Sequence, residues 1–195
     1  MALAQPQAHR FTVDDYYRMA DAGILNEDSR VELLRGEIVG MAPIGSHHAA
    51  CVAGLTRLFV ERLGSRAVVW TQNPVRLDDL SEPEPDLALL RPRDDNYAGG
   101  HPTPKDVLLL IEVGDTTATS DREYKLPIYA DAGVAEVWLV DLPAGIVEVC
   151  RLPGDGAYQD RARCDPDDRV VPDAFDDVVI DVVDILPAGS ADPAT

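Results

Sequence analysis

The chain has 195 residues, of which 46% are hydrophobic, and its formal net charge is −18. This length predicts one domain that buries its own core, and no run approaches the roughly 18 apolar residues of a membrane span. The charge argues against a broadly basic surface that coats nucleic acid, because phosphate binding depends on Lys and Arg.

Two features of the sequence predict a cytoplasmic protein. The N-terminus lacks the basic start and apolar core of a signal peptide. The three cysteines, Cys51, Cys150 and Cys164, are odd in number and have no ligand-like spacing. We therefore expect buried free thiols in a reducing compartment.

The charged residues are unevenly distributed along the chain, and the basic ones are almost all Arg. Residues 153–184 contain ten Asp and three Arg, whereas the whole chain contains fifteen Arg and only two Lys, Lys105 and Lys125. Arg is always charged, but Lys can shift its pKa and act as a compact donor or base. A lysine in this chain is therefore a mild indication of chemistry.

The N-terminal part predicts a helix and a hairpin. Residues 1–10 are expected to form a disordered lead. Thr12 is a typical N-cap for a helix that stops at Gly23, and residues 31–41 have the pattern of a hairpin. Glu32 lies on this hairpin, either as a solvent-facing strand acid or as part of a site.

A long helix is predicted from His47 to Leu63, with Gly64 after its end. Its apolar residues recur at helical spacing and predict a buried stripe. The stripe consists of Cys51, Val52, Leu55, Leu58, Phe59 and Leu63. His47 and His48 lie in the first turn, where both are exposed polar residues unless His48 faces the same cleft as Glu32.

Short strands and a long loop follow. The pattern predicts strands over residues 67–72 and 75–77, and Asp86 opens another strand over residues 87–90. Residues 91–106 are rich in Pro and Gly and predict a loop of a length that is usually functional or mobile.

The apolar run over residues 107–111 is typical of a strand buried on both faces. Glu112 ends this run, and an acid there must be paired, metal-bound or exposed at the strand end. Residues 135–141 predict a second buried strand, and the helical segment between the two runs indicates a parallel crossover.

The crossover helix is expected over residues 121–132, with Ser120 as its cap. Pro127 falls inside it and predicts a kink or a late start. The residues that share one face of this helix at i, i+4 spacing are Asp121, Lys125 and Tyr129.

The C-terminal part predicts strands and a frayed end. Residues 146–152 and 158–163 have the pattern of a strand pair joined by a Pro-Gly-Asp-Gly turn. Residues 178–180 predict a further short strand, and residues 187–195 are expected to form a disordered tail.

The acids and one lysine predict a metal-dependent site. Phosphodiester hydrolysis needs a divalent cation that neutralises negative charge and lowers the pKa of an attacking water. Asp86 and Glu112, each at the end of a buried strand, would supply carboxylates, and the carbonyl of Val113 a third ligand. Lys125 would orient or deprotonate the water, or stabilise the phosphate. Alternatively, the acids are ordinary strand-end residues, and Asp121 and Lys125 form a helix-surface pair.

Several motifs together resemble one family. They are Val31-Glu32-Leu33-Leu34-Arg35-Gly36-Glu37, Met41-Ala42-Pro43 followed by His48, Pro85-Asp86, Glu112-Val113, Asp121-Arg122-Glu123-Tyr124-Lys125 and Glu136-Val137-Trp138. Over about residues 11–141 they resemble the Uma (Uma-two) family, whose members are restriction-endonuclease-like proteins of the PD-(D/E)xK nuclease superfamily.

The resemblance implies an α/β fold over residues 11–186, namely a restriction-endonuclease-like mixed sheet flanked by helices, with an N-terminal helix and hairpin. It implies an acidic metal site made by Glu32, Asp86 and Glu112. The superfamily's lysine normally lies two residues after the second acid, where this chain has Gly114. Lys125 resembles the displaced lysine that the family supplies instead.

Three functions are compatible with these residues. The leading hypothesis is an endonuclease that uses Mg²⁺ or Mn²⁺ to cut DNA in a local groove, with Glu32, Asp86, Glu112 and Lys125 as catalytic residues. The accessory residues would be His48, Asp121 and Tyr129. A symmetric homodimer is expected for a two-strand cutter. The alternatives are a catalytically silent binding or scaffold protein with an acidic surface, and a hydrolase of small phosphoesters.

Overall fold

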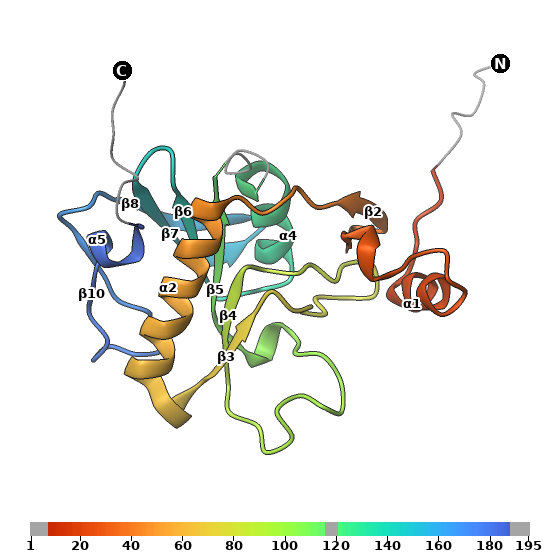
Figure 1. Cartoon of the computed structure of the whole chain (residues 1–195), viewed down its shortest axis with the longest axis horizontal. Helices are drawn as coiled ribbons and strands as arrows, with labels where there is room; N and C mark the ends of the chain where they lie inside the picture. The colour runs from red at the N-terminus through yellow and green to blue at the C-terminus, as the bar shows by residue number, and fades with distance from the viewer. Residues whose placement is uncertain (1–7, 116–120, 188–195) are drawn as a thin grey trace.

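A six-stranded mixed sheet forms the centre of the computed structural model, which describes residues 8–115 and 121–187 (Figure 1). Its strands, in spatial order, are β3 (Val68–Thr71), β4 (Leu87–Leu90), β5 (Val107–Gly114), β6 (Glu136–Asp141), β7 (Ile146–Gly154) and β8 (Ala157–Cys164). The β5–β6 pair is parallel and the other neighbours are antiparallel. The expected mixed sheet with a parallel crossover is confirmed.

Helices and short strands cover both faces of this sheet. Helix α2 (Ser46–Leu63) packs on one face, together with the segment of β9 (Arg169–Val170), β10 (Ile180–Asp181) and α5 (Val182–Ile185). Helix α4 (Leu126–Asp131) packs on the other face, where the hairpin of β1 (Val31–Leu34) and β2 (Glu37–Gly40) also contributes apolar residues. Short 3-10 turns lie at Glu27–Ser29, Gly64–Arg66 and Pro104–Asp106.

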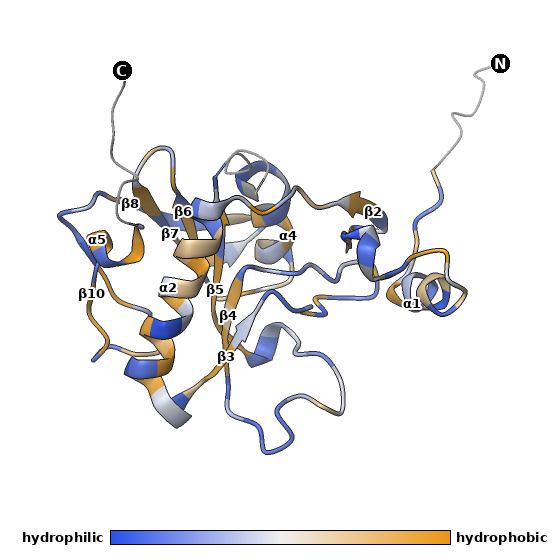
Figure 2. Ribbon diagram, viewed as in Figure 1, coloured by the Kyte–Doolittle hydropathy of each residue, from blue (hydrophilic) through white to orange (hydrophobic). Residues whose placement is uncertain are grey.

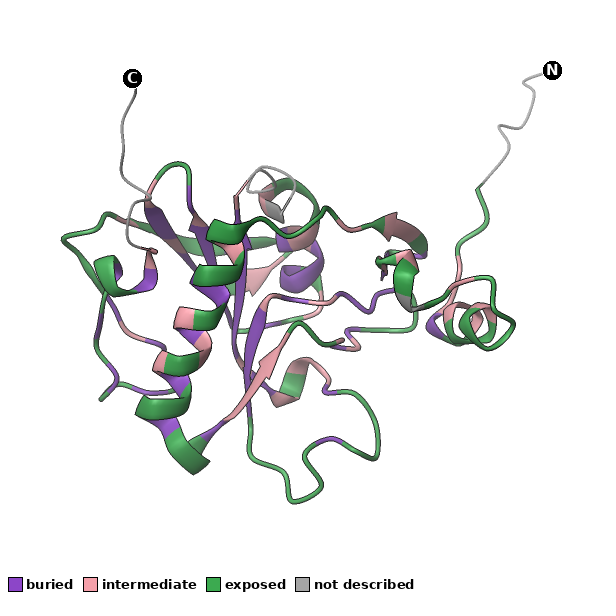
Figure 3. Cartoon of the chain, viewed as in Figure 1, coloured by how far each residue is buried: buried purple, intermediate pink, exposed green. Residues whose placement is uncertain are grey.

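Strand β5 is buried because its side chains alternate between these two layers. Leu109 and Ile111 belong to the cluster under α2, whereas Leu110 belongs to the cluster under α4. Figure 2 shows apolar residues along β4 and β5, and Figure 3 shows these two strands as buried. A run that is apolar at consecutive positions is the expected pattern for such a strand.

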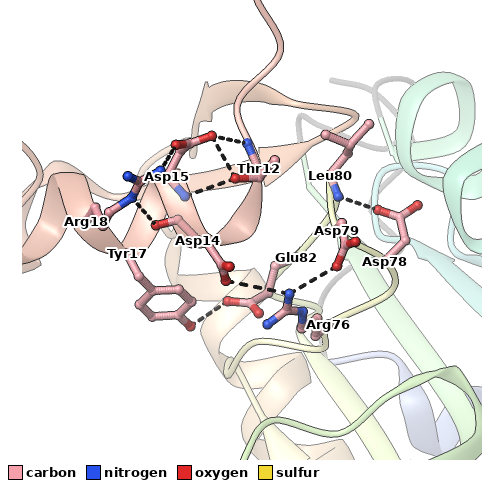
Figure 4. Close-up of polar contacts among 10 residues, drawn as sticks. All are labelled: Thr12, Asp14, Asp15, Tyr17, Arg18, Arg76, Asp78, Asp79, Leu80 and Glu82. Atoms are coloured by element: carbon pink, nitrogen blue, oxygen red, sulfur yellow. Dashed lines mark hydrogen bonds and ion pairs between the residues drawn. The ribbon is translucent and has the colours of Figure 1, made fainter.

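Helix α1 (Val13–Asp21) lies to one side of the sheet, beside the hairpin, and is largely exposed (Figures 1 and 3). As the sequence predicts, Thr12 caps it, in a capping box with Asp15. The Tyr17 hydroxyl donates a hydrogen bond of 2.5 Å to Glu82 Oε1, and Arg76 forms ion pairs with Asp14 and with Asp79 (Figure 4). These contacts hold α1 against the turn before β4.

The crossover helix starts late, in the way that Pro127 predicts. Residues Asp121–Lys125 form a π-helical turn, η4, and the α-helix begins at Leu126. Pro127 therefore lies in the first turn of α4, where its missing N–H breaks no helical hydrogen bond. The predicted cap Ser120 and the tails at 1–7 and 188–195 lie outside the described residues.

Two predictions about strands are wrong. Residues 75–77 form no strand, because their N–H groups donate hydrogen bonds to carbonyls that lie outside any strand, those of Pro83, Pro102 and Ser81. Val75 and Leu77 are nevertheless buried. Strand β5 does not end at Glu112, since its parallel pairing with β6 continues to Gly114. The predicted strand over 178–180 shares only Ile180 with the observed strand β10, Ile180–Asp181.

A buried carboxylate ties the C-terminal segment to the sheet. Glu136, whose side chain is fully buried, accepts hydrogen bonds from Trp138 Nε1 at 2.8 Å and from the Asp173 N–H at 2.7 Å. Arg151 forms an ion pair with Glu136 at 2.6 Å and donates to the carbonyl of Val171. Burial raises the pKa of Glu136, and these partners oppose that shift.

We expect Arg151→Met to lower the free energy of unfolding by about 3 kcal/mol, because it leaves the Glu136 carboxylate buried without its cation. The control is Arg163→Met, since the ion pair of Arg163 with Asp165 is exposed; it should change stability by less than about 0.5 kcal/mol. Urea denaturation of the two variants measures both effects. Equal losses would show that Glu136 does not depend on Arg151.

Candidate active site

One cleft collects the acids that the sequence predicts. A cavity of about 1020 Å³ is lined by α1, the hairpin, the start of α2, η4 and the ends of the central strands. We call it the acidic cleft. The predicted site residues that line it are Glu32, His48, Asp86, Glu112, Val113 and Lys125.

Asp86 and Glu112 lie on the same face of the sheet. Leu87 pairs with Ile111 in the antiparallel register of β4 and β5. Continued by one residue, this register places Asp86 opposite Glu112, and directly opposed residues share a face. The Val113 N–H also donates a hydrogen bond of 2.8 Å to Asp86 Oδ2, which brings this carboxylate to the edge of β5.

Lys125 connects two buried acids that are distant in the sequence. Its Nζ lies 3.2 Å from Glu32 Oε2 and 3.3 Å from Glu112 Oε1. The three side chains are only 12%, 5% and 3% exposed, in the order Lys125, Glu32, Glu112. Glu32 is therefore not the solvent-facing strand acid that its pattern allowed. The side chain of Asp121, the other proposed partner of Lys125, lies outside the described part of the chain.

Tyr129 orients Glu112 from the same helical face as Lys125. Its hydroxyl donates a hydrogen bond of 2.5 Å to Glu112 Oε1, and its side chain is fully buried. Side chains four residues apart on a helix point in the same direction, so the predicted shared face of Lys125 and Tyr129 brings both to one carboxylate.

His48 contacts Asp86 from the first turn of α2. His48 Nε2 lies 2.8 Å from Asp86 Oδ1. This hydrogen bond raises the pKa of His48, burial opposes the shift, and a hydrogen bond to the Val113 backbone adds to it. The neighbouring His47 is exposed, so the two histidines that looked equivalent in the sequence have different surroundings.

Comparison with known protein families identifies the family of this chain. Residues 13–183 match the model of the Uma2 family, which is described as "Putative restriction endonuclease". The chain belongs to the Uma2 family. The resemblance drawn from the sequence motifs is thereby confirmed, and no curated protein matches the chain.

A solved structure shows the same fold. The chain is similar to the crystal structure of a "putative nuclease belonging to DUF820" from Anabaena variabilis ATCC 29413. The two share 17% sequence identity, with a TM-score of 0.70, over 90% of this chain and 97% of that one. This likeness shows that the Uma2 chain has the nuclease fold that the sequence predicted.

A lysine reaches Glu112 from the crossover connection and not from the strand that carries Glu112. Gly114, two residues after Glu112, has no side chain to offer. Lys125 approaches the same carboxylate from η4, across the crossover connection. A π-helical turn inserts an extra residue per turn relative to an α-helix and often occurs at functional sites.

Several residues of the cleft were not predicted from the sequence. Glu84 lines it, and its N–H donates a hydrogen bond of 3.1 Å to Glu32 Oε2. Burial raises the pKa of Glu84, and the charge of Glu32 adds to the shift. Gln72 and Arg30 also line the cleft, although neither stands in a pattern that indicates a site. No residue of the 91–106 loop is among those lining residues.

The donors suit a hard cation with few protein ligands. Asp86, Glu112 and the Val113 carbonyl offer only oxygen, which Mg²⁺ and Mn²⁺ prefer. Among the described residues, no group of three or more His, Cys, Asp and Glu side chains is arranged to hold a metal ion. Mg²⁺ is commonly bound by only one or two carboxylates plus water, so Asp86 and Glu112 are the residues that could hold it. In the described part of the chain no helix combines the length and apolar composition needed to cross a membrane.

We expect Lys125→Met to lower the free energy of unfolding of the metal-free protein by about 3 kcal/mol, since two buried carboxylates lose the cation they share. Lys105→Met is the matched control, because Lys105 is the only other lysine and is exposed. It should change stability by less than about 0.5 kcal/mol. Chemical denaturation in EDTA measures the difference. Similar losses of unfolding free energy for the two variants would contradict the view that Lys125 stabilises the buried carboxylates.

Proposed function

We propose that this Uma2 chain is a nuclease that hydrolyses phosphodiester bonds in DNA with the help of Mg²⁺ or Mn²⁺. The observation that carries the proposal is the meeting of Lys125 with Glu32 and Glu112, in one cleft with Asp86. These residues come from four separate segments. Membership of the Uma2 family and the nuclease fold support the same conclusion.

The metal ligands would be Asp86, Glu112 and the carbonyl of Val113. A divalent ion supplies two things when bound, namely neutralisation of developing negative charge and a lower pKa for a bound water. His48 and Tyr129 would keep the two carboxylates in place, because each forms a hydrogen bond with one of them. Outer contacts of this kind orient metal ligands.

Lys125 would act on the reacting groups. Its ammonium group already lies against Glu112, so it is positioned to orient the water or to stabilise the phosphate. Glu32 would hold the ammonium group in this position from the other side, at 3.2 Å. This assigns Glu32 a positioning role and Lys125 a catalytic one.

Removing either metal ligand should abolish cleavage without unfolding the protein. We expect Asp86→Asn and Glu112→Gln each to eliminate Mg²⁺-dependent cleavage of DNA, together with the Mg²⁺-induced rise in Tm that the wild type should show. Asp160→Asn, at an exposed position outside the cleft, should keep both. Cleavage assays and thermal melting with and without Mg²⁺ test this.

A second candidate function predicts a different result from the same experiment. The net charge of −18 favours a catalytically silent binding protein whose acidic surface meets a basic partner. A wild-type protein that shows no change in Tm with Mg²⁺ or Mn²⁺ and cuts no DNA would support this function and overturn the nuclease proposal.

The choice of lysine at position 125 gives a further test. A lysine that served only the ion pairs with Glu32 and Glu112 would not set the cleavage rate, but a group that touches the water or the phosphate needs a compact ammonium. We expect Lys125→Arg to keep the fold and to lower the cleavage rate roughly 10²-fold or more, the effect of losing an acid–base group. Lys105→Arg should cut at the wild-type rate, and a wild-type rate for Lys125→Arg would show that Lys125 is structural.

A further inference from the structure

The acidic cleft extends beyond the carboxylates into an aromatic part. Tyr16 and Tyr17 of α1 and Tyr124 of η4 line it, together with apolar residues of the segment that joins β2 to α2. Tyr124 is 54% exposed and Tyr17 is 39% exposed, and both are among the most exposed large apolar side chains described. Exposed aromatic rings beside a candidate site indicate a ligand with flat apolar faces.

Two of these rings are held in place before any ligand binds. The Tyr16 hydroxyl donates a hydrogen bond of 2.8 Å to the Val31 carbonyl, and the Tyr17 hydroxyl donates to Glu82. The Tyr17 ring also stacks on His101, with ring centroids 6.4 Å apart, and meets the Tyr16 ring edge to face. Both rings are therefore already ordered, and little conformational freedom is left to lose on binding. Tyr124 and Lys125 both belong to η4 and both line the cleft.

The charges in the cleft do not suit a DNA duplex. Duplex binding depends on Lys and Arg that neutralise many phosphates. The cleft-lining residues include the carboxylates of Glu32, Glu84, Asp86, Glu112 and Asp115. Among the described residues, the Lys and Arg side chains that line it are Arg30 and Lys125. A single bound divalent ion would not reverse this balance, and the whole chain carries −18.

Single strands can bind by a different interaction. Their bases stack on aromatic rings, which depends little on sequence and adds to the few phosphate contacts available. The cavity of about 1020 Å³ is at the upper end of the roughly 300–1,000 Å³ range of ligand pockets. It therefore suits a short unstacked segment and not a double helix.

We propose that the substrate is single-stranded DNA, whose bases stack on Tyr124 and Tyr17 while Arg30 contacts a phosphate. This inference rests on the proposed nuclease function. Arg30 is exposed at the cleft and lies just before β1, which carries Glu32. A single-strand cutter needs one active site, whereas the homodimer expected from the sequence follows from cutting both strands.

The first test compares substrates with the wild-type protein. A labelled oligonucleotide is offered as a single strand, as a fully paired duplex, and as a duplex with a short single-stranded gap, with Mg²⁺ or Mn²⁺. We expect the single strand and the gap to be cut at least 10-fold faster than the duplex. Equal or faster cutting of the duplex would overturn this inference and leave the nuclease proposal standing.

The second test removes the stacking surface. Tyr124→Ala should raise KM for the single strand about 10-fold with little change in kcat, whereas Tyr124→Phe should behave as the wild type. Val183→Ala, at an exposed apolar residue outside the cleft, is the control. A Tyr124→Ala variant with a wild-type KM would overturn the stacking role, provided that its Tm shows it to be folded.

The third test concerns Arg30 and salt. Arg30→Gln should reduce the slope of log kcat/KM against log salt by about 0.7, the value for one phosphate contact on a single strand. Arg57→Gln, at an exposed position of α2 away from the cleft, should leave the slope unchanged. Equal slopes for wild type and Arg30→Gln would overturn the phosphate contact.

A result without any cleavage would overturn the proposed function, and the substrate preference would then be measured by binding. Fluorescence anisotropy with the same oligonucleotides should show tighter binding of the single strand than of the duplex. Tighter binding of the duplex, or no binding of either form, would overturn the inference about the cleft.

Discussion

The ammonium group of Lys125 between two buried carboxylates is the constraint on which the site depends. Glu32 and Glu112 could not be buried side by side without a cation, because their charges would repel in a medium of low dielectric. The shared ion pair joins the hairpin, the central strand and the crossover turn. It therefore holds together one wall of the acidic cleft and brings the lysine that we propose as catalytic to Glu112.

The proposed function has to be compatible with a strongly acidic chain. Under this proposal, the basic groups that contact the substrate, Arg30 and Lys125, line the cleft, so the surface as a whole does not need to attract nucleic acid. A protein of this kind would not attract nucleic acid over a long range through a basic surface. Its affinity for the substrate would have to come from short-range contacts. Aromatic rings that are fixed by hydrogen bonds, such as Tyr16 and Tyr17, provide contacts of this kind.

The positions of His48 and Tyr129 show how the fold supports the acids. Each comes from a helix on a different side of the sheet, and each holds one carboxylate. Glu112 lies on β5 and Asp86 directly precedes β4, and burial on both faces fixes the register of these two strands. Acids placed on or beside strands and oriented by helices are held more precisely than acids on long loops.

The sequence by itself determined the elements that local patterns encode. Consecutive apolar residues predicted β5 and β6, Thr12 and Gly64 marked the ends of helices, and Pro127 predicted a late helix start. These features depend on neighbours in the chain. Tertiary structure alone decided that Glu32 is buried, that residues 75–77 form no strand, and that the C-terminal segment is held at Glu136. The reason is that burial of a charge, and the partner of a backbone N–H, depend on groups far away in the sequence.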